Sequence, residues 1–358
     1  MKVYLDNSGT TKAYDEVGDL VRKVLCEDFG NPSSMHYRGV ESEQYIKEAK
    51  DTLAKILKVQ QKEIFFTSGG TESDNWALIG AARANKRAGK HLIASSIEHP
   101  AILNTLRFLE EEEGYRVTYL PVDAYGRVKL DALQEALCPE TILVSIMYVN
   151  NEVGSVQPIQ EAASIVKAYN KDILFHVDAV QGFGKYRIYP KKLKVDMLSV
   201  SGHKIHGPKG VGFLYIDEHV KIRPIIYGGG QQKNLRPGTE PTELIASFEA
   251  AVKAYPADLT HYSELNGYLR DRLSKMEDVY INSPDNSVYN ILSFSVLGVR
   301  SEIMLHSLEE KEIYVSSGSA CSKGKISSVP DAFGMNSERA DSTIRVSFSM
   351  ETTKEDID

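Results

Sequence analysis

Asp196-Met197-Leu198-Ser199-Val200-Ser201-Gly202-His203-Lys204-Ile205-His206-Gly207-Pro208-Lys209-Gly210-Val211-Gly212 is the stretch of sequence that decides the fold. An apolar strand runs into a small, polar, glycine-rich turn, and the turn carries Lys204 with Ser201 and His203 just before it. Another apolar strand lies upstream and ends in Phe175-His176-Val177-Asp178-Ala179-Val180-Gln181, so that Asp178 precedes Lys204 by 26 residues. Strands that end in polar residues are typical of α/β proteins, whose ligands bind where the strands end.

The lysine and the strand-end carboxylate together indicate pyridoxal 5'-phosphate chemistry. A lysine that forms an imine carries this cofactor, and an acid keeps its pyridine nitrogen protonated. We assign these tasks to Lys204 and Asp178. The alternative is that Lys204 is a solvated lysine in a glycine-rich turn, and the motifs described below argue against it.

Short apolar runs alternate with amphipathic stretches from about residue 64 to residue 216. Expected strands cover residues 64–67, 91–95, 117–120, 142–148, 173–177, 197–200 and 211–215. Expected helices cover residues 72–88, 101–113, 130–137 and 159–169. This alternation predicts a mostly parallel, doubly wound sheet with both faces covered. Each motif singled out in this region falls at or just after the carboxyl end of a strand, which supports one shared site.

The two ends of the chain are expected to form a second, smaller unit. The N-terminal contribution is an apolar run at residues 3–6. The amphipathic helices expected next, near 14–27 and 42–57, belong to the large unit. After about residue 242 a long helix leads to strands near 290–296, 313–315 and 343–348. We therefore expect an α/β protein with a large domain over 15–250 and a smaller αβ domain made of 1–14 and 251–358. Residues 353–358 resemble the start of a final helix.

Composition excludes several classes of protein. The chain has 358 residues with 42 Lys+Arg and 49 Asp+Glu, a net charge of −7, which gives no electrostatic basis for binding nucleic acid or an anionic membrane. No apolar run reaches roughly eighteen residues, and no signal-peptide core begins the chain. The three cysteines are widely spaced, which argues against a disulfide scaffold or a zinc site. We expect a cytoplasmic protein without a metal site.

Gly69-Gly70-Thr71 follows the expected strand 64–67 and opens a helix. Bare backbone amides at a helix N-terminus bind phosphate well, and Thr71 adds a hydroxyl. The alternative is an ordinary helix cap. We assign Gly70 and Thr71 to the cofactor phosphate, with help from Ser201 and His203.

Three polar residues at neighbouring strand ends are expected to contact the cofactor ring. His99 either begins a helix with no further task or stacks on the pyridine and moves protons. Asn151 follows the strand 142–148 and either makes a turn or hydrogen-bonds the phenolic oxygen of the cofactor or the substrate. Gln181 would reach the same oxygen, whereas His176 is assigned to packing.

Cys321 lies in Ser316-Ser317-Gly318-Ser319-Ala320-Cys321-Ser322-Lys323-Gly324-Lys325. Small residues favour exposure, and nearby positive charge favours the thiolate, so Cys321 is a candidate nucleophile. An incidental loop thiol is the alternative. Cys26, by contrast, lies in the apolar run Val24-Leu25-Cys26 that is typical of a structural cysteine.

Arg345 is the one charged residue of the alternating strand 342–348. The guanidinium fork fits an α-carboxylate because it binds both oxygens at once, so we assign Arg345 to the substrate. An exposed arginine on an edge strand is the alternative.

With these motifs assembled, the chain resembles the cysteine desulfurases of the NifS/IscS type, in the class V aminotransferase group of fold type I pyridoxal phosphate enzymes. The resemblance runs from Tyr4-Leu5-Asp6-Asn7-Ser8-Gly9-Thr10-Thr11 to Ile344-Arg345-Val346-Ser347, essentially the whole chain. Further matching segments are residues 31–36, 67–75, 98–99, 150–154, 177–181, 201–204, 207–210, 236–239 and 316–321.

The resemblance implies an enzyme that converts L-cysteine to L-alanine and carries the sulfur as a persulfide on Cys321. Lys204 or His99 would move the Cα proton, while Arg345 and Asn151 bind the substrate. The sulfur would pass to an acceptor protein, either an iron–sulfur scaffold or a tRNA or cofactor thiolation enzyme. The resemblance also implies a homodimer in which Thr239 reaches the phosphate of the partner's cofactor, and a long, mobile loop around Cys321.

Two departures and two alternatives accompany the resemblance. Gly70 stands where the family often has alanine, and residues 323–329 replace the usual run that ends in Leu-Glu-Pro-Ser, which leaves the choice of acceptor open. One alternative is a pyridoxal phosphate enzyme without a catalytic thiol, such as an aminotransferase for small amino acids or a selenocysteine lyase. The other is a non-catalytic sulfur-assembly scaffold, which the intact Lys204, Asp178 and Cys321 argue against.

Overall fold

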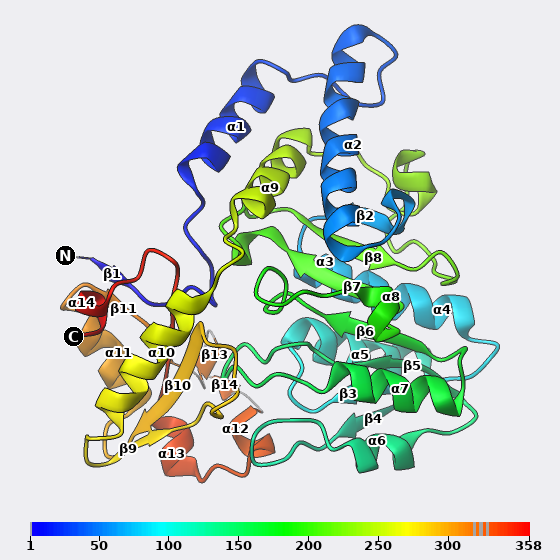
Figure 1. Cartoon of the computed structure of the whole chain (residues 1–358). Coiled ribbons are helices and arrows are strands. Elements are labelled where there is room, and N and C mark those ends of the chain that lie inside the picture. The colour runs from blue at the N-terminus through cyan, green and yellow to red at the C-terminus, as the bar shows by residue number, and fades with distance from the viewer. Residues whose placement is uncertain (1, 318–319, 322–324, 327–328) are drawn as a thin grey trace.

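A seven-stranded sheet forms the centre of the molecule (Figure 1). The computed structural model describes residues 2–317, 320–321, 325–326 and 329–358. The strand order is β2-β8-β7-β6-β5-β3-β4, and only β8 runs against the other strands of this sheet. The strands are β2 (Ile64–Thr67), β3 (His91–Ser95), β4 (Arg116–Leu120), β5 (Thr141–Ser145), β6 (Leu174–Asp178), β7 (Met197–Ser201) and β8 (Gly212–Ile216).

Helices cover both faces of this sheet because successive apolar residues of each strand point to opposite sides. Phe66 and Leu198 belong to the core on one face, whereas their neighbours Phe65 and Met197 belong to the core on the other. The first face packs against α2 (Tyr37–Leu57), α6 (Leu130–Ala136), α7 (Ile159–Tyr169) and α9 (Thr242–Ala254). The second packs against α3 (Gly70–Asn75), the π-helix η2 (Trp76–Gly80), α4 (Ala81–Asn85) and α5 (Pro100–Glu113).

The C-terminal part of the chain builds a second, antiparallel sheet with the order β12-β15-β10-β9. Its strands are β9 (Val279–Ile281), β10 (Ile291–Val296), β12 (Ser316–Ser317) and β15 (Thr343–Ser347), while β1 (Val3–Tyr4) pairs with β11 (Ile313–Tyr314). Two further short strands, β13 (Ala320–Cys321) and β14 (Lys325–Ile326), pair with each other. Helices in this part are α10 (Thr260–Leu273), α11 (Ser301–Glu309), α12 (Val329–Ala332), α13 (Ser337–Asp341) and α14 (Lys354–Ile357).

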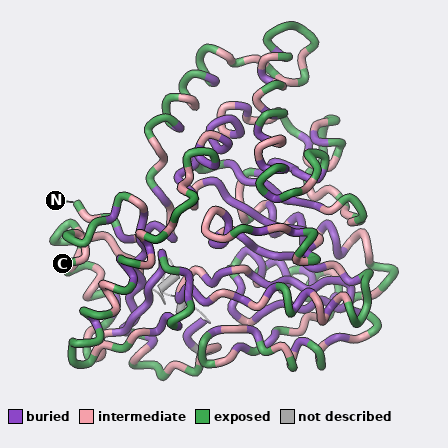
Figure 2. The backbone as a smooth tube through the Cα atoms, viewed as in Figure 1, coloured by how far each residue is buried: buried purple, intermediate pink, exposed green. Residues whose placement is uncertain are grey.

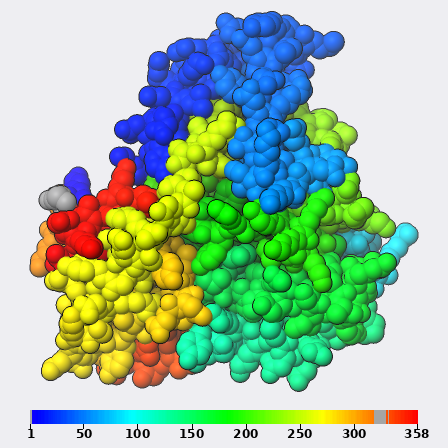
Figure 3. Space-filling view, in the orientation of Figure 1, coloured from blue at the N-terminus to red at the C-terminus, as the bar shows by residue number. Residues whose placement is uncertain are grey.

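The two termini lie side by side in this second unit, and the buried residues concentrate in the sheets (Figures 1 and 2). Helices α1 (Asp15–Cys26) and α2 project from the body of the molecule, as the blue region of Figure 3 shows. Short elements complete the chain: η1 (Gln61–Glu63), α8 (Pro190–Leu193), η3 (Gly202–Lys204) and η4 (Gln231–Asn234). None of the described helices is both long and apolar enough to cross a bilayer.

The expected strands and helices are confirmed to within a few residues, with two differences. The expected helix over 72–88 consists of α3, a π-helical turn and α4, and it begins at Gly70. The second N-terminal helix begins at Tyr37 rather than near residue 42. The interpretation of Cys26 as a buried structural cysteine is wrong: it is exposed, because α1 buries only Val17 and Val24.

Candidate active site

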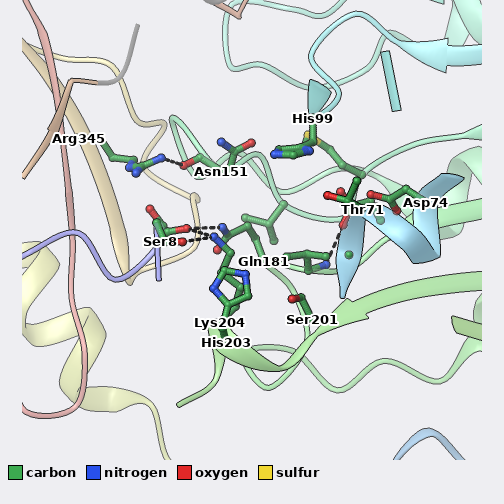
Figure 4. Close-up of a pocket in the computed structure, with 16 residues that line it drawn as sticks. Ser8, Thr71, Asp74, His99, Asn151, Gln181, Ser201, His203, Lys204 and Arg345 are labelled. Atoms are coloured by element: carbon green, nitrogen blue, oxygen red, sulfur yellow. Dashed lines mark hydrogen bonds between the residues drawn. The ribbon is translucent and has the colours of Figure 1, made fainter. Parts of the chain in front are cut away.

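A cavity of about 340 Å³ opens where strands of the large sheet end (Figure 4). It brings together ten residues that the sequence assigns to the site: Gly70, Thr71, His99, Asn151, Asp178, Gln181, Ser201, His203, Lys204 and Arg345. Asp178 and Ser201 end strands of the large sheet, most of the others lie in loops and helix starts after its strands, and Arg345 comes from β15 of the second sheet. The cavity therefore lies between the two sheets.

Lys204 ends the short 3₁₀ turn η3, which directly follows β7. Its amine donates hydrogen bonds to the carbonyl oxygens of Ser8 at 2.5 Å and Gly9 at 2.6 Å. Burial, and next the charge of Arg345, lower the pKa of Lys204 to about 8, although Asp6 and Asp178 act in the opposite direction. Lys204 is thus held inside the cavity, and the alternative of a solvated lysine is wrong.

Asp178 is the last residue of β6 and is 6% exposed. Its Oδ1 accepts a hydrogen bond from the N–H of Val180 at 2.9 Å. Burial raises the pKa of Asp178, while this hydrogen bond and the charges of His99 and Lys204 lower it. A cation in the cavity would therefore favour the ionised carboxylate.

Asp74 is a second buried carboxyl group in the cavity wall, and the sequence did not single it out. Its Oδ1 has no hydrogen-bond partner and lies 3.8 Å from Nε2 of His176. Burial, and next the charge of Asp178, raise the pKa of Asp74 well above its usual value. His176 is fully buried between Ser145 and Ser199, which agrees with its assignment to packing.

His99 is the N-cap of α5, and its Nδ1 accepts a hydrogen bond from the N–H of Ala101 at 3.1 Å. Burial lowers the pKa of His99, and so does Lys204, whereas Asp178 raises it. A neutral imidazole whose Nδ1 accepts must carry its proton on Nε2. His99 is therefore arranged to donate a hydrogen bond from Nε2.

Gly70 begins the helical run 70–85, and Thr71 follows it at the cavity wall. A Cβ on Gly70 would lie 2.8 Å from Cγ2 of Val180, so a larger residue here would require the Val180 side chain to shift. Gly69 has φ +145°, a conformation that favours glycine. Ser201 is buried and lies beside the same turn. Its Oγ is 3.4 Å from the position that a Cβ on Gly69 would take.

The other predicted residues have protein partners of their own. Nδ1 of His203 lies 3.1 Å from the hydroxyl of Thr10, and burial lowers the pKa of His203 to about 4. Gln181 is buried and donates from Nε2 to the carbonyl of Ser8 at 3.0 Å. Asn151 lines the cavity, and its carbonyl accepts a hydrogen bond from Arg345.

Arg345 lies on β15 between β10 and β12 and is 7% exposed, so the alternative of an exposed edge-strand arginine is wrong. Nη1 donates to the carbonyl of Asn151 at 2.9 Å, and Nη2 donates to Oδ1 of Asp6 at 2.7 Å. Nε is buried without a partner. The guanidinium therefore keeps N–H groups for a ligand in the cavity.

Two predicted residues are not among those that line this cavity. Thr239 is exposed on the loop after η4, where Arg236 forms a fork with Glu72 of α3 at 2.8 and 3.0 Å. Cys321 ends β13, but its side chain lies outside the described part of the structure. Ser8 and Gly9 line the cavity and were missed as site residues, although the polar run 6–11 after the apolar start was the available signal.

Comparisons with known proteins place this geometry in a family. The class-V aminotransferase family matches residues 3–358. The cysteine desulfurase IscS of Dictyoglomus turgidum is 43% identical over 364 residues, which covers 99% of this chain and 92% of that protein. The cysteine desulfurase IscS of Methanosarcina thermophila is also 43% identical, with 99% of this chain and 89% of that protein covered.

Solved structures agree with this assignment. A NifS-like protein superposes with a TM-score of 0.93 and 39% identity, over 100% of this chain and 96% of that chain. A structure of SspA in complex with cysteine has a TM-score of 0.85 and 34% identity, over 97% of this chain and 98% of that chain. The first match confirms the expected fold type I α/β architecture. The chain belongs to the class-V aminotransferase family, and within it to the cysteine desulfurase group of enzymes.

Proposed function

We propose that this enzyme uses pyridoxal 5'-phosphate to convert L-cysteine to L-alanine and collects the sulfur on Cys321. The observation that carries the proposal is the presence of the Lys204 amine, the buried Asp178 carboxylate and the Arg345 guanidinium in one cavity. The neighbour solved as SspA in complex with cysteine supports the choice of substrate.

The residues of the cavity fit the cofactor. The helical run that begins at Gly70 starts at the cavity wall, where backbone N–H groups suit a phosphate, and Thr71, Ser201 and His203 line the same cavity. Asp178 would hold the ring nitrogen, while Gln181 and Asn151 would hold the phenolic oxygen. When bound, pyridoxal 5'-phosphate supplies an electron sink for the bonds at Cα of the substrate.

The protein's own groups position the substrate and move its protons. Arg345 would bind the α-carboxylate of the substrate, with Asn151 at its side. Lys204 is the better base for the Cα proton, because His99 has no free acceptor nitrogen: Nδ1 accepts from the N–H of Ala101, and Nε2 carries the proton. The pKa of about 8 leaves much of the Lys204 amine neutral near that pH. His99 would stack on the cofactor ring and donate from Nε2, since Nδ1 is occupied by the N–H of Ala101.

Cys321 would take the sulfur in one balanced step. Its thiolate attacks the substrate sulfur, so that an S–S bond forms while the C–S bond breaks. The electron pair of the broken bond stays on the substrate carbon, which takes up a proton to give L-alanine. A thiol of an acceptor protein then attacks the terminal sulfur of the persulfide. An iron–sulfur scaffold or a thiolation enzyme is the proposed acceptor.

We also propose the assembly and organisation expected from the sequence: a cytoplasmic homodimer in which Thr239 reaches the phosphate site of the partner. The exposure of Thr239 outside its own cavity supports this role. The proposed domains are residues 15–250 for the large one and 1–14 with 251–358 for the small one. Packing of α1 on α9, and of Leu5 in the core of the small sheet, supports the boundary near residue 14, while α9 continues past residue 250 to Ala254.

The test is the release of alanine and sulfide from L-cysteine, with and without dithiothreitol, by the wild type and by Cys321→Ser. Release by the wild type alone, while the mutant keeps the visible absorbance of the cofactor, is the expected result. Equal release by both proteins would assign the sulfur chemistry to a lyase that needs no catalytic thiol. No release by either protein with cofactor bound would point to another amino-acid substrate.

A further inference from the structure

Residues 5–11 form a strap that runs along β15, the strand that carries Arg345. The N–H of Ser347 donates to the carbonyl of Leu5 at 2.7 Å. The side chain of Asn7 donates to the carbonyl of Ser347 at 2.9 Å. The strap is therefore fixed to the same strand as the proposed carboxylate-binding residue.

The other end of the strap is fixed to the turn that carries Lys204. The N–H and the hydroxyl of Thr11 both donate to the carbonyl of His203, at 3.0 and 2.9 Å. Between these attachments, the carbonyls of Ser8 and Gly9 accept hydrogen bonds from the Lys204 amine. One short segment thus contacts both groups that the proposed reaction needs for the substrate.

Asp6 is the charged residue of this strap, and it forms an ion pair with Arg345. The distance from Oδ1 of Asp6 to Nη2 is 2.7 Å, and the side chains of Asp6 and Arg345 are 28% and 9% exposed. The carbonyl of Asn151 holds Nη1 at 2.9 Å, while Nε has no partner. The guanidinium is therefore held at both terminal nitrogens, while its Nε–H has no protein partner that a substrate carboxylate would have to displace.

Gly9 provides the space in which the Asp6 carboxylate lies. A Cβ on Gly9 would be 2.4 Å from Oδ2 and 2.9 Å from Oδ1 of Asp6, which is closer than real contacts allow. Gly9 does not have a positive φ, so alanine is compatible with its backbone. A methyl group added at Gly9 would therefore displace the Asp6 carboxylate from its position beside Arg345.

We propose that Asp6 is a positioning residue for Arg345, which it holds in the orientation that binds the substrate carboxylate, and that Gly9 makes room for it. This inference rests on the proposed function, in which Arg345 binds an amino acid. A guanidinium held beforehand loses less freedom when the carboxylate binds, so the ion pair increases affinity for ligands that have a carboxylate. Ligands without one gain nothing from it.

The test compares two ligands of the cofactor-loaded enzyme by isothermal titration calorimetry. L-Alanine carries the carboxylate, and L-alaninol has the same amine with a hydroxyl in its place. Asp6 also acts on Lys204, which affects both ligands alike, so the readout is the ratio of the two dissociation constants. Asp6→Ala should raise the Kd of L-alanine about tenfold relative to that of L-alaninol, the loss typical of a charge-assisted hydrogen bond. Asp6→Asn keeps an acceptor oxygen and should lose less.

Gly9→Ala supplies a steric version of the same test. As a single substitution it should raise the Kd of L-alanine. Combined with Asp6→Ala it should raise that Kd no further, because the carboxylate that the methyl group would displace is then absent. Unchanged L-alanine affinity in Asp6→Ala would overturn the inference, and so would equal weakening of both ligands. Gly9→Ala and Asp6→Asn serve if Asp6→Ala does not fold. A loaded wild type that binds L-alaninol but not L-alanine would contradict the proposed function, and with it the inference.

Discussion

The side-chain amine of Lys204 lies 2.5 Å from the carbonyl oxygen of Ser8, a residue 196 positions earlier in the chain. This contact holds the amine inside the cavity, where burial and the charge of Arg345 lower its pKa to about 8. Ser8 and Gly9 near the N-terminus therefore form part of the cavity around Lys204. The lowered pKa of Lys204 can be tested through the pH dependence of its reaction with the cofactor.

The rate at which the apo protein attaches pyridoxal 5'-phosphate should rise with pH through about 8 and then level off, because only the neutral amine is a nucleophile. Stopped-flow absorbance at a series of pH values measures this rate. Arg345→Met should move the inflection to higher pH, since it removes a cation that lowers the pKa of Lys204. A rate that does not change across pH 8 would contradict the perturbed pKa.

Lys204→Ala should abolish alanine release and leave added cysteine bound at the site, because the base and the covalent attachment of the cofactor are both lost. Lys204→Arg is the matched control, since it keeps the positive charge but offers no comparable nucleophile. Amino-acid analysis after incubation with L-cysteine measures the product. Alanine release at the wild-type rate would remove Lys204 from the proposed chemistry.

Asp178→Asn should lower the rate of alanine formation on the order of a hundredfold or more, because a neutral amide cannot stabilise a protonated ring nitrogen. The fold should persist, since the amide oxygen can still accept from the N–H of Val180. The experiment measures kcat together with the circular dichroism spectrum. An unchanged kcat with bound cofactor would separate Asp178 from the ring nitrogen.

Arg236→Met should lower the stability of the protein by about 3 kcal/mol at neutral pH, because it leaves the Glu72 carboxylate half-buried and unpaired. Burial raises the pKa of Glu72, but the Arg236 fork and the N–H of Ser68 hold it below its usual value. This stabilisation is complete above the pKa of the unfolded state and is lost as the pH falls through the lower, folded pKa.

Urea denaturation of both proteins at several pH values checks this prediction. The difference in unfolding free energy between the wild type and Arg236→Met should shrink as the pH falls below about 4, the ordinary range of a glutamate. A difference that is constant with pH would show that Arg236 stabilises the protein by packing alone. Lys62→Met, which removes an exposed ion pair with Glu218, is the control and should have little effect.

Several properties of this protein are determined by the sequence itself. The apolar runs at 64–67, 91–95 and 197–200 form β2, β3 and β7, since burial on both faces of a sheet demands such runs. The polar residues that follow them, Lys204 among them, meet in one cavity because parallel strands end at the same edge. These inferences succeed because they depend on local pattern and on a topology that the pattern implies.

Other properties were decided by the tertiary structure alone. The alternation of apolar and polar residues in β15 is compatible with an edge strand and with a central strand. The pairing of β15 with both β10 and β12 makes it central and buries Arg345. Cys26 lies in an apolar run yet is exposed, because the packing of α1 selects one face. The contacts of Ser8 with Lys204 and of Asp6 with Arg345 join segments that are far apart in the chain. Their geometry depends on how the two sheets pack together, which no local pattern encodes.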